Sequence, residues 1–198
     1  MYEYSGQIRR FITQFIRIVS NFEVEFGTDE NGLVTRRVPV LYGDPSRQVA
    51  QILQNNSENT LNAVPAMAVY VTGLEYDRER VQEPALVQKS HVRQREFDSV
   101  TGTYTQKQGN AYTIERLMPV PYRLKLKLDI WTSSTEHKLQ LLEQIAPMFN
   151  PAFEIQNTDQ YFDWTSLTAV FLTDTTWDSR SVPVGQSEAI SIATMSFD

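Results

Sequence analysis

Hydrophobic and polar residues alternate most strictly over residues 122–130. Alternate positions are apolar: Tyr122, Leu124, Leu126, Leu128 and Ile130. The positions between them are charged: Arg123, Lys125, Lys127 and Asp129. A period of two is typical of a strand with one buried face. The pattern therefore predicts a strand with an apolar face toward the core and a basic face away from it.

A helix is predicted directly after this strand. Ser133 and Glu136 have the spacing of a capping box, in which two side chains satisfy backbone amides at a helix start. Apolar residues then recur at steps of three and four, which predicts one buried helix face: Leu139, Leu142, Ile145, Ala146 and Phe149. Pro147 has no backbone N–H and crowds the preceding turn, so the helix is expected to end or kink there.

The N-terminal segment Ser5–Asn21 also has the period of an amphipathic helix. Its apolar stripe comprises Ile8, Phe11, Ile12, Phe15, Ile16 and Val19. Arginines occupy the other side, so the helix fits two roles: lying on a membrane or partner, or packing on a sheet of its own chain. Three arginines are few for membrane binding, which favours packing.

Further strands are predicted on both sides of these segments. A hairpin turns at Asn31-Gly32 and returns over Leu33–Leu41, with Pro39 at an edge or bulge. The other predicted strands are Ala66–Leu74, Phe153–Gln156, Ser166–Leu172 and Ala189–Phe197, with a short helix over residues 44–54 and a connection over residues 174–185. The fold class expected for the single domain 1–198 is α+β: a mixed, mainly antiparallel sheet with helices packed on it.

Residues 75–117 form a polar insertion. They contain seven acidic and seven basic residues and few large apolar ones, so they cannot form a core of their own. A hairpin is expected to turn near residues 99–102. Two interpretations stay open: an extended arm that becomes ordered on a neighbouring subunit, or a flexible surface loop. The polar insertion and the basic face of the strand 122–130 contain the candidate interface residues: Arg93, Arg95, Phe97, Tyr104, Arg123, Lys125 and Lys127.

The net charge of −6 lies at the C-terminal end. From residue 150 onward the chain has seven acidic residues and one basic residue, so the rest is balanced. This charge asymmetry has two interpretations. The acidic segment forms a surface that repels a polyanion or binds a basic partner, or it is simply a solvated acidic face. Net negative charge argues against general nucleic-acid affinity.

Candidate chemistry is sparse. The chain has no cysteine, which excludes thiolate metal sites and fits synthesis in a reducing cytoplasm. His91 and His137 have no metal-ligand spacing, and no phosphate-binding loop or nucleophile elbow occurs. No apolar run is long enough to span a bilayer, and no secretory signal is present. We expect no catalytic, cofactor or metal site.

Several segments together resemble the tail sheath stabiliser and completion proteins, or tail terminators, of T-even-like contractile-tailed bacteriophages. They are Arg9-Arg10 with Ser20-Asn21, Arg37-Val38-Pro39-Val40 with Tyr42, Val64-Pro65, and residues 119–151. The most specific is Glu143-Gln144-Ile145-Ala146-Pro147 with Phe149. The order and spacing of these segments carry the resemblance.

The resemblance implies a virion structural protein at the neck end of the tail. It implies a homohexameric ring that caps tail tube and sheath, joins neck or connector proteins, and passes DNA without specific contact. Like charge would keep DNA from sticking, so acids of the C-terminal third are candidates to line the channel: Asp159, Asp163, Asp174 and Asp178. The strand face of Arg123, Lys125 and Lys127 either meets an acidic neighbour such as the sheath or is solvated. The alternatives are another neck or baseplate-connector subunit, or a small cytoplasmic binding module or enzyme.

Overall fold

The computed structural model describes residues 4, 6–30, 32–44, 46–47, 64–81, 83, 85, 87–117, 120–156, 167–181 and 189–198. The chain divides into two compact units. The first comprises Met1–Leu74 and Leu124–Asp198, and the second is Glu75–Arg123. The predicted arm, residues 75–117, lies within the second unit.

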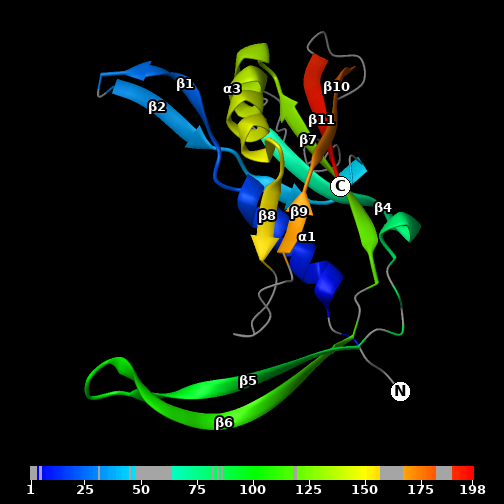
Figure 1. Cartoon of the computed structure of the whole chain (residues 1–198). Coiled ribbons are helices and arrows are strands. Elements are labelled where there is room, and N and C mark those ends of the chain that lie inside the picture. The colour runs from blue at the N-terminus through cyan, green and yellow to red at the C-terminus, as the bar shows by residue number, and fades with distance from the viewer. Residues whose placement is uncertain are drawn as a thin grey trace. The chain divides into compact units, whose positions relative to one another are not determined.

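A five-stranded sheet forms the framework of the first unit (Figure 1). Its strands, in spatial order, are β10 (Leu172–Ser181), β11 (Ala189–Phe197), β7 (Tyr122–Thr132), β4 (Ala66–Tyr76) and β3 (Val40–Tyr42). β11 pairs antiparallel with both β10 and β7, whereas β3 and β4 are parallel. The mixed, mainly antiparallel sheet confirms the predicted fold class.

Two helices pack on the same face of this sheet. They are α1 (Gln7–Val19) and α3 (Thr135–Ile145), the latter continued by the 3₁₀ turn η2 (Ala146–Phe149). α3 ends at Ile145, two residues before Pro147, as the missing amide of proline requires. The expected positions of both helices are therefore confirmed.

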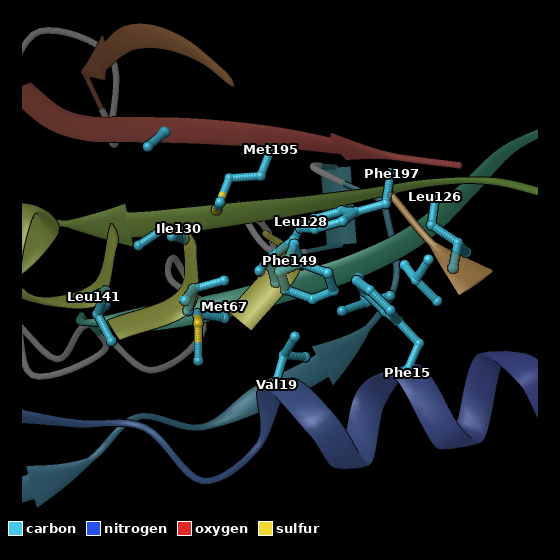
Figure 2. Close-up of a cluster of buried hydrophobic side chains, with 14 of the residues drawn as sticks. Phe15, Val19, Met67, Leu126, Leu128, Ile130, Leu141, Phe149, Met195 and Phe197 are labelled. Carbon is cyan, nitrogen blue, oxygen red and sulfur yellow. The ribbon is translucent and has the colours of Figure 1, made fainter. Parts of the chain in front are cut away.

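The main core lies between the helices and the sheet (Figure 2). Phe15 and Val19 point from α1 toward β7 and β11, while Phe149 lies between the two layers. The rings of Phe15 and Phe197 meet edge to face with centroids 5.0 Å apart. The strands supply the other large buried side chains: Met67, Leu126, Leu128, Ile130 and Met195. This arrangement confirms the predicted apolar face over Leu124–Ile130, whereas Tyr122, at the start of the strand, is 58% exposed.

The buried face of α3 differs from the prediction. The N-cap is Ser134, whose hydroxyl accepts a hydrogen bond from the Glu136 amide at 3.2 Å, and not Ser133. Leu141 is fully buried, whereas Leu139 is 39% exposed. Lys138 is also buried, with its ammonium 4.1 Å from the centroid of the Trp177 ring. Because a lysine occupied one buried position, apolar periodicity alone assigned the wrong leucine.

Two strand boundaries also differ from expectation. The returning strand of the first hairpin is interrupted at Val38 and Pro39, so that β3 leaves it and joins the large sheet. Residues 172–181 form strand β10 where a connection was expected, and the predicted strand 166–172 reaches only Val170. β10 lacks an alternating apolar face because it is an edge strand rich in threonine and serine.

Two small sheets complete the first unit. β1 (Glu23–Asp29) and β2 (Gly32–Arg37) form the N-terminal hairpin, and β8 (Phe153–Gln156) pairs with β9 (Leu167–Val170). Side chains of α3 bond the backbone of β1: Gln140 Oε1 accepts from the Glu25 amide at 2.9 Å, and Gln144 Nε2 donates to the Glu23 carbonyl at 2.8 Å. The helix thus covers part of the β1 edge. The predicted helix 44–54 lies outside the described residues, apart from a short part of it.

The second unit contains the 3₁₀ turn η1 (Arg78–Arg80) and the hairpin of β5 (Val87–Asp98) and β6 (Thr103–Leu117). The chain turns over residues 99–102, as predicted. Nearly all described side chains of this hairpin are exposed. We call residues 87–117 the arm.

Candidate assembly surfaces

The arm has two distinct faces because directly opposed residues of an antiparallel pair point to the same side. One face begins with cross-strand polar pairs. Lys89 Nζ lies 2.7 Å from Glu115 Oε1, and His91 Nδ1 lies 3.0 Å from Thr113 Oγ1. Farther along, the Arg93 guanidinium donates to Gln108 Oε1. We call this side the arginine face.

The arginine face continues to the tip of the arm. Arg93, Arg95 and Phe97 are spaced by two along β5, so strand alternation puts them on one side. Tyr104 is the register partner of Phe97, and the two rings meet edge to face at 5.1 Å. Strand spacing thus puts the four candidate residues of the arm on one side, although the pairing with β6 is irregular on both sides of Arg95, and only the two aromatic rings are in contact. Both aromatic side chains are more than half exposed.

The opposite face of the arm is apolar near its base. Val92 is paired with Tyr112, and Ile114 neighbours them on the same side. Val92 and Ile114 are half-buried, whereas Tyr112 stays exposed, with its hydroxyl 3.4 Å from Gln94 Oε1. This small cluster is too thin to form a core for a hairpin of this length.

Local hydrogen bonds fix the tip. Asp98 Oδ1 accepts from the Val100 amide and Asp98 Oδ2 from the Thr101 hydroxyl, both at 2.9 Å. These bonds lower the pKa of Asp98 below its ordinary value, against a smaller opposing effect of burial. Gly102 has a φ of 65°, a conformation that glycine adopts without strain. The turn is thus ordered by its own residues.

A buried carboxylate holds the root of the arm. Asp77 is 7% exposed, and its Oδ2 lies 2.9 Å from Arg123 Nε and 3.4 Å from Arg80 Nε. Burial alone would raise the pKa of Asp77, but the hydrogen bond and charge of Arg123, with the charge of Arg80, lower it. Arg123, predicted as an interface residue, is therefore ion-paired within its own chain. Asp77 itself was missed, because one acid among seven in a polar segment carries no distinguishing signal.

The other two basic residues of β7 lie on the sheet face opposite the helices. Lys125 and Lys127 are half-buried there. Asp129 and Trp131 follow on the same side and are fully buried, Trp131 in a second core cluster with Val64, Ile190 and Ile192. The predicted solvated face of β7 is therefore solvated only toward its N-terminal end.

Asp129 is the buried titratable group of this face. The Thr194 hydroxyl donates to its Oδ1 at 2.7 Å, and the Tyr70 hydroxyl lies 3.5 Å from the same atom. Burial raises the pKa of Asp129, opposed by these hydrogen bonds and by the charge of Lys127. Burial also raises the pKa of Tyr70 to about 12, together with the charges of Asp129 and Asp44.

Strand register places the two described candidate acids on this same sheet face. Asp174 opposes Ser196, which opposes Lys127, and Asp178 opposes Ile192, which opposes Trp131. Both acids are exposed on β10. Asp174 accepts a hydrogen bond from the Thr175 amide at 2.8 Å, and Asp178 accepts one from the Ser179 amide at 2.7 Å. Neither carboxylate has an ion-pair partner in the described part of the chain. Asp159 and Asp163 lie outside the described residues.

The N-terminal segments that carry the family resemblance converge around one arginine. Arg37 Nε donates to the Ser20 carbonyl at 2.7 Å, and its guanidinium also donates to Asn21 Oδ1 at 2.9 Å. Residues on either side of these bonds line a shallow, open hollow: Ser20, Arg37, Val38, Pro39 and Val40. Arg37 thereby joins the end of α1 to the end of β2, which gives this pair of motifs a structural role.

Two kinds of functional feature do not occur in the part of the chain that the structure describes. That part contains no group of three or more His, Asp or Glu side chains placed to hold a metal ion. It also contains no helix long and apolar enough to cross a membrane.

The fold and these surfaces define a class: an α+β protein with a coreless hairpin and a sheet edge that can pair with a strand of another chain. The sequence model of the T4-like virus Myoviridae tail sheath stabiliser family matches residues 2–198, so the chain belongs to this family. It is a structural protein of the phage tail and hence of the virion. No curated protein matches the chain significantly.

Proposed function

We propose that this chain terminates the contractile tail as a closed homohexameric ring, whose subunits are joined through the arm. The ring rests on the last sheath and tube subunits and offers its other side to neck or connector proteins, with DNA passing through its channel. The protein acts by binding its partners and catalyses no reaction. Membership of the tail sheath stabiliser family supports association with the sheath.

The observation that carries the ring proposal is the exposure of the arm on both faces. Two paired strands of 12 and 15 residues lie outside any core cluster of the described residues. An isolated two-stranded hairpin is marginally stable in water, so contact with another subunit would stabilise it. In a cyclic assembly every arm finds an identical acceptor, which supports a closed ring.

The charged residues of the sheet face are candidates for two different contacts. Lys125 and Lys127 are candidates for contact with the sheath, and Asp174 and Asp178 for the channel wall. Because all four lie on one sheet face, these two assignments compete for the same surface. Contact with a neighbouring subunit is the alternative for the two acids.

Deletion of residues 92–108 tests the role of the arm. The deletion leaves His91 paired with Thr113 and closes the shortened hairpin with Gly109-Asn110-Ala111-Tyr112. We expect a folded subunit with the thermal unfolding of the first unit intact and no rings. Negative-stain microscopy and light scattering measure the outcome, with the unmodified chain as the control. Unchanged six-fold rings would show that the arm does not join the subunits.

Tail assembly in the absence of the protein tests the function itself. Tails produced by a phage with this gene silenced are expected to lose their sheath on storage, and added wild-type protein should preserve it. The arm-deleted protein is the matched control and should fail to do so. Sheaths equally stable with and without the protein would contradict the proposal.

A further inference from the structure

We propose that β10 is the acceptor for the arm of a second copy of this chain, with Arg93 and Arg95 of one subunit against Asp174 and Asp178 of the next. The inference rests on the proposed ring and names the surface that each arm contacts. It assigns the two described acids to the contact between subunits.

β10 has the geometry of an acceptor strand. It is ten residues long and forms one end of the five-stranded sheet, and among the described strands it pairs only with β11. Its other edge therefore carries backbone amides and carbonyls that are free of strand partners within the described chain. Such an edge accepts an added strand through main-chain hydrogen bonds, and side chains then set the partner and the register.

The arm supplies a matching edge. β5 pairs with β6 on one side and with no other described strand on its second side. β5 and β10 are thus two described strands of similar length, one in each compact unit, and each has an edge without a strand partner in the described chain. Joining them between subunits would extend the five-stranded sheet of one copy with the hairpin of the next.

Charge complementarity selects a second copy as the occupant. Residues 87–117 contain five basic and three acidic residues, a net charge of +2. The two ion pairs of the arm use Lys89 with Glu115 and Lys107 with Glu96, which leaves the Arg95 guanidinium without an acidic partner in the described chain. Exposed Asp174 and Asp178 likewise have no basic partner there. Both surfaces belong to this chain, so no other protein is needed to complete them.

The spacing of the charges fits an added strand. Asp174 and Asp178 are four residues apart and Arg93 and Arg95 two apart, which corresponds to about 13 and 7 Å along a strand. Two long arginine side chains reach diagonal neighbours across a strand pair and cover this difference. Trp177, 52% exposed on the other side of β10, adds an aromatic surface at the centre of the same edge.

A charge exchange between separate subunits tests the pairing. Arg93→Glu with Arg95→Glu, and Asp174→Lys with Asp178→Lys, are each expected to reduce the ring fraction at least about tenfold, because like charges then face each other. A 1:1 mixture of the two variants should restore rings, since arm and acceptor are complementary again in alternating subunits. Glu143→Lys with Glu154→Lys, two exposed acids on α3 and β8, is the control of equal charge change and should keep its rings. Mass photometry gives the ring fraction and circular dichroism the folding.

The outcomes separate this inference from the proposed ring. If arm deletion abolishes rings but the Asp174 and Asp178 variant keeps them, the ring stands and β10 is not the acceptor. If that variant keeps its rings and retains DNA more tightly than the wild type, the acids line the channel. Rescue only when all four substitutions are in one chain would place the contact within a subunit and overturn the inference. Absence of rings from wild-type protein would contradict the ring itself.

Cross-linking gives a second measurement that does not need complete rings. The chain has no cysteine, so Arg95→Cys and Asp178→Cys each introduce a single thiol. Mild oxidation of a mixture of the two variants should yield a mixed disulfide dimer well above the yield with Glu154→Cys in place of Asp178→Cys. Equal yields with both partners would overturn the proposed contact.

Discussion

Asp129 shows how a charged residue behaves on a strand that is buried on both faces near one end. Trp131 and Thr132, which follow it in β7, are also fully buried. The Asp129 carboxylate is therefore shielded from solvent, and its hydrogen-bond partners are the hydroxyls of Thr194 and Tyr70. The strict alternation of residues 122–130 placed Asp129 with the solvated bases. Sequence alone did not reveal its burial, because the residues that cover it come from strands far along the chain.

Asp129 makes stability depend on pH. Burial raises its folded-state pKa above the ordinary value of 3.8, so the folded protein holds this proton more tightly than the unfolded chain does. Its contribution to stability is complete below the ordinary pKa and is lost as pH rises through the raised value. Asp129→Asn keeps an acceptor for Thr194 without the charge. We expect its Tm to exceed that of the wild type by a few degrees at neutral pH, where about 1 kcal/mol corresponds to roughly 2–4 °C.

The pH series contains its own control. At about pH 3 the carboxyl is protonated in both states, so the two melting temperatures should converge. Asp174→Asn, at an exposed position of the same sheet face, should change Tm little at any pH. A loss of stability in Asp129→Asn that grows as pH rises would mean that the ionised carboxylate stabilises the fold.

At the scale of elements, α3 connects three parts of the first unit. Leu141 and Ile145 enter the core, Lys138 donates to Ser191 Oγ on β11 at 2.5 Å, and Gln140 and Gln144 bond the backbone of β1. The helix therefore holds the N-terminal hairpin against the sheet.

Two leucines of α3 provide a direct test of which face is buried. Leu141→Ala removes a fully buried side chain and should lower the free energy of unfolding by about 2–5 kcal/mol. Leu139→Ala changes a partly exposed side chain of the same type and should cost less than about 1 kcal/mol. Urea denaturation of the two variants makes the comparison. Similar costs would show that the helix is rotated from the orientation described here.

Sequence patterns located most elements because local rules decide them. The strand 122–130, the end of a helix before Pro147 and the turn at residues 99–102 follow from alternation, missing amides and turn residues. β10 was missed because an edge strand has little apolar surface to mark it. In the candidate interface, strand spacing places Arg93, Arg95 and Phe97 on one side of β5. The ion pair of Asp77 with Arg123 could not be predicted, because it joins residues far apart in the sequence and periodicity reports only on neighbours.

At the scale of the whole molecule, the two units differ in how they are stabilised. The first unit has two clusters of buried side chains, whereas the described part of the second contributes none to either cluster. Regions with few buried contacts open at low free energy. The first unit therefore has a core of its own, whereas the described part of the second has few buried contacts to hold it in place.

Hydrogen exchange should resolve this difference. In dilute free subunits, amides of β5 and β6 are expected to exchange much faster than those of β7 and β11, and in rings they should become protected. The amides of β7 serve as the internal control, because their core contacts are the same in both states. Equal protection of the arm in subunits and rings would show that the hairpin is stable without a neighbour.

The two edges of the large sheet are unlike. β10 offers ten residues to an incoming strand, whereas β3, at the opposite edge of the described sheet, has only three and follows Pro39, which has no amide to donate. In the proposed ring, an acceptor at one edge only would give the assembly a polarity: each copy would receive its neighbour from one direction, and face-to-face pairs would be disfavoured. All subunits of a closed assembly then turn the same side toward the same end, so its two surfaces differ chemically. Such an object can sit between two different structures and bind each with a different face.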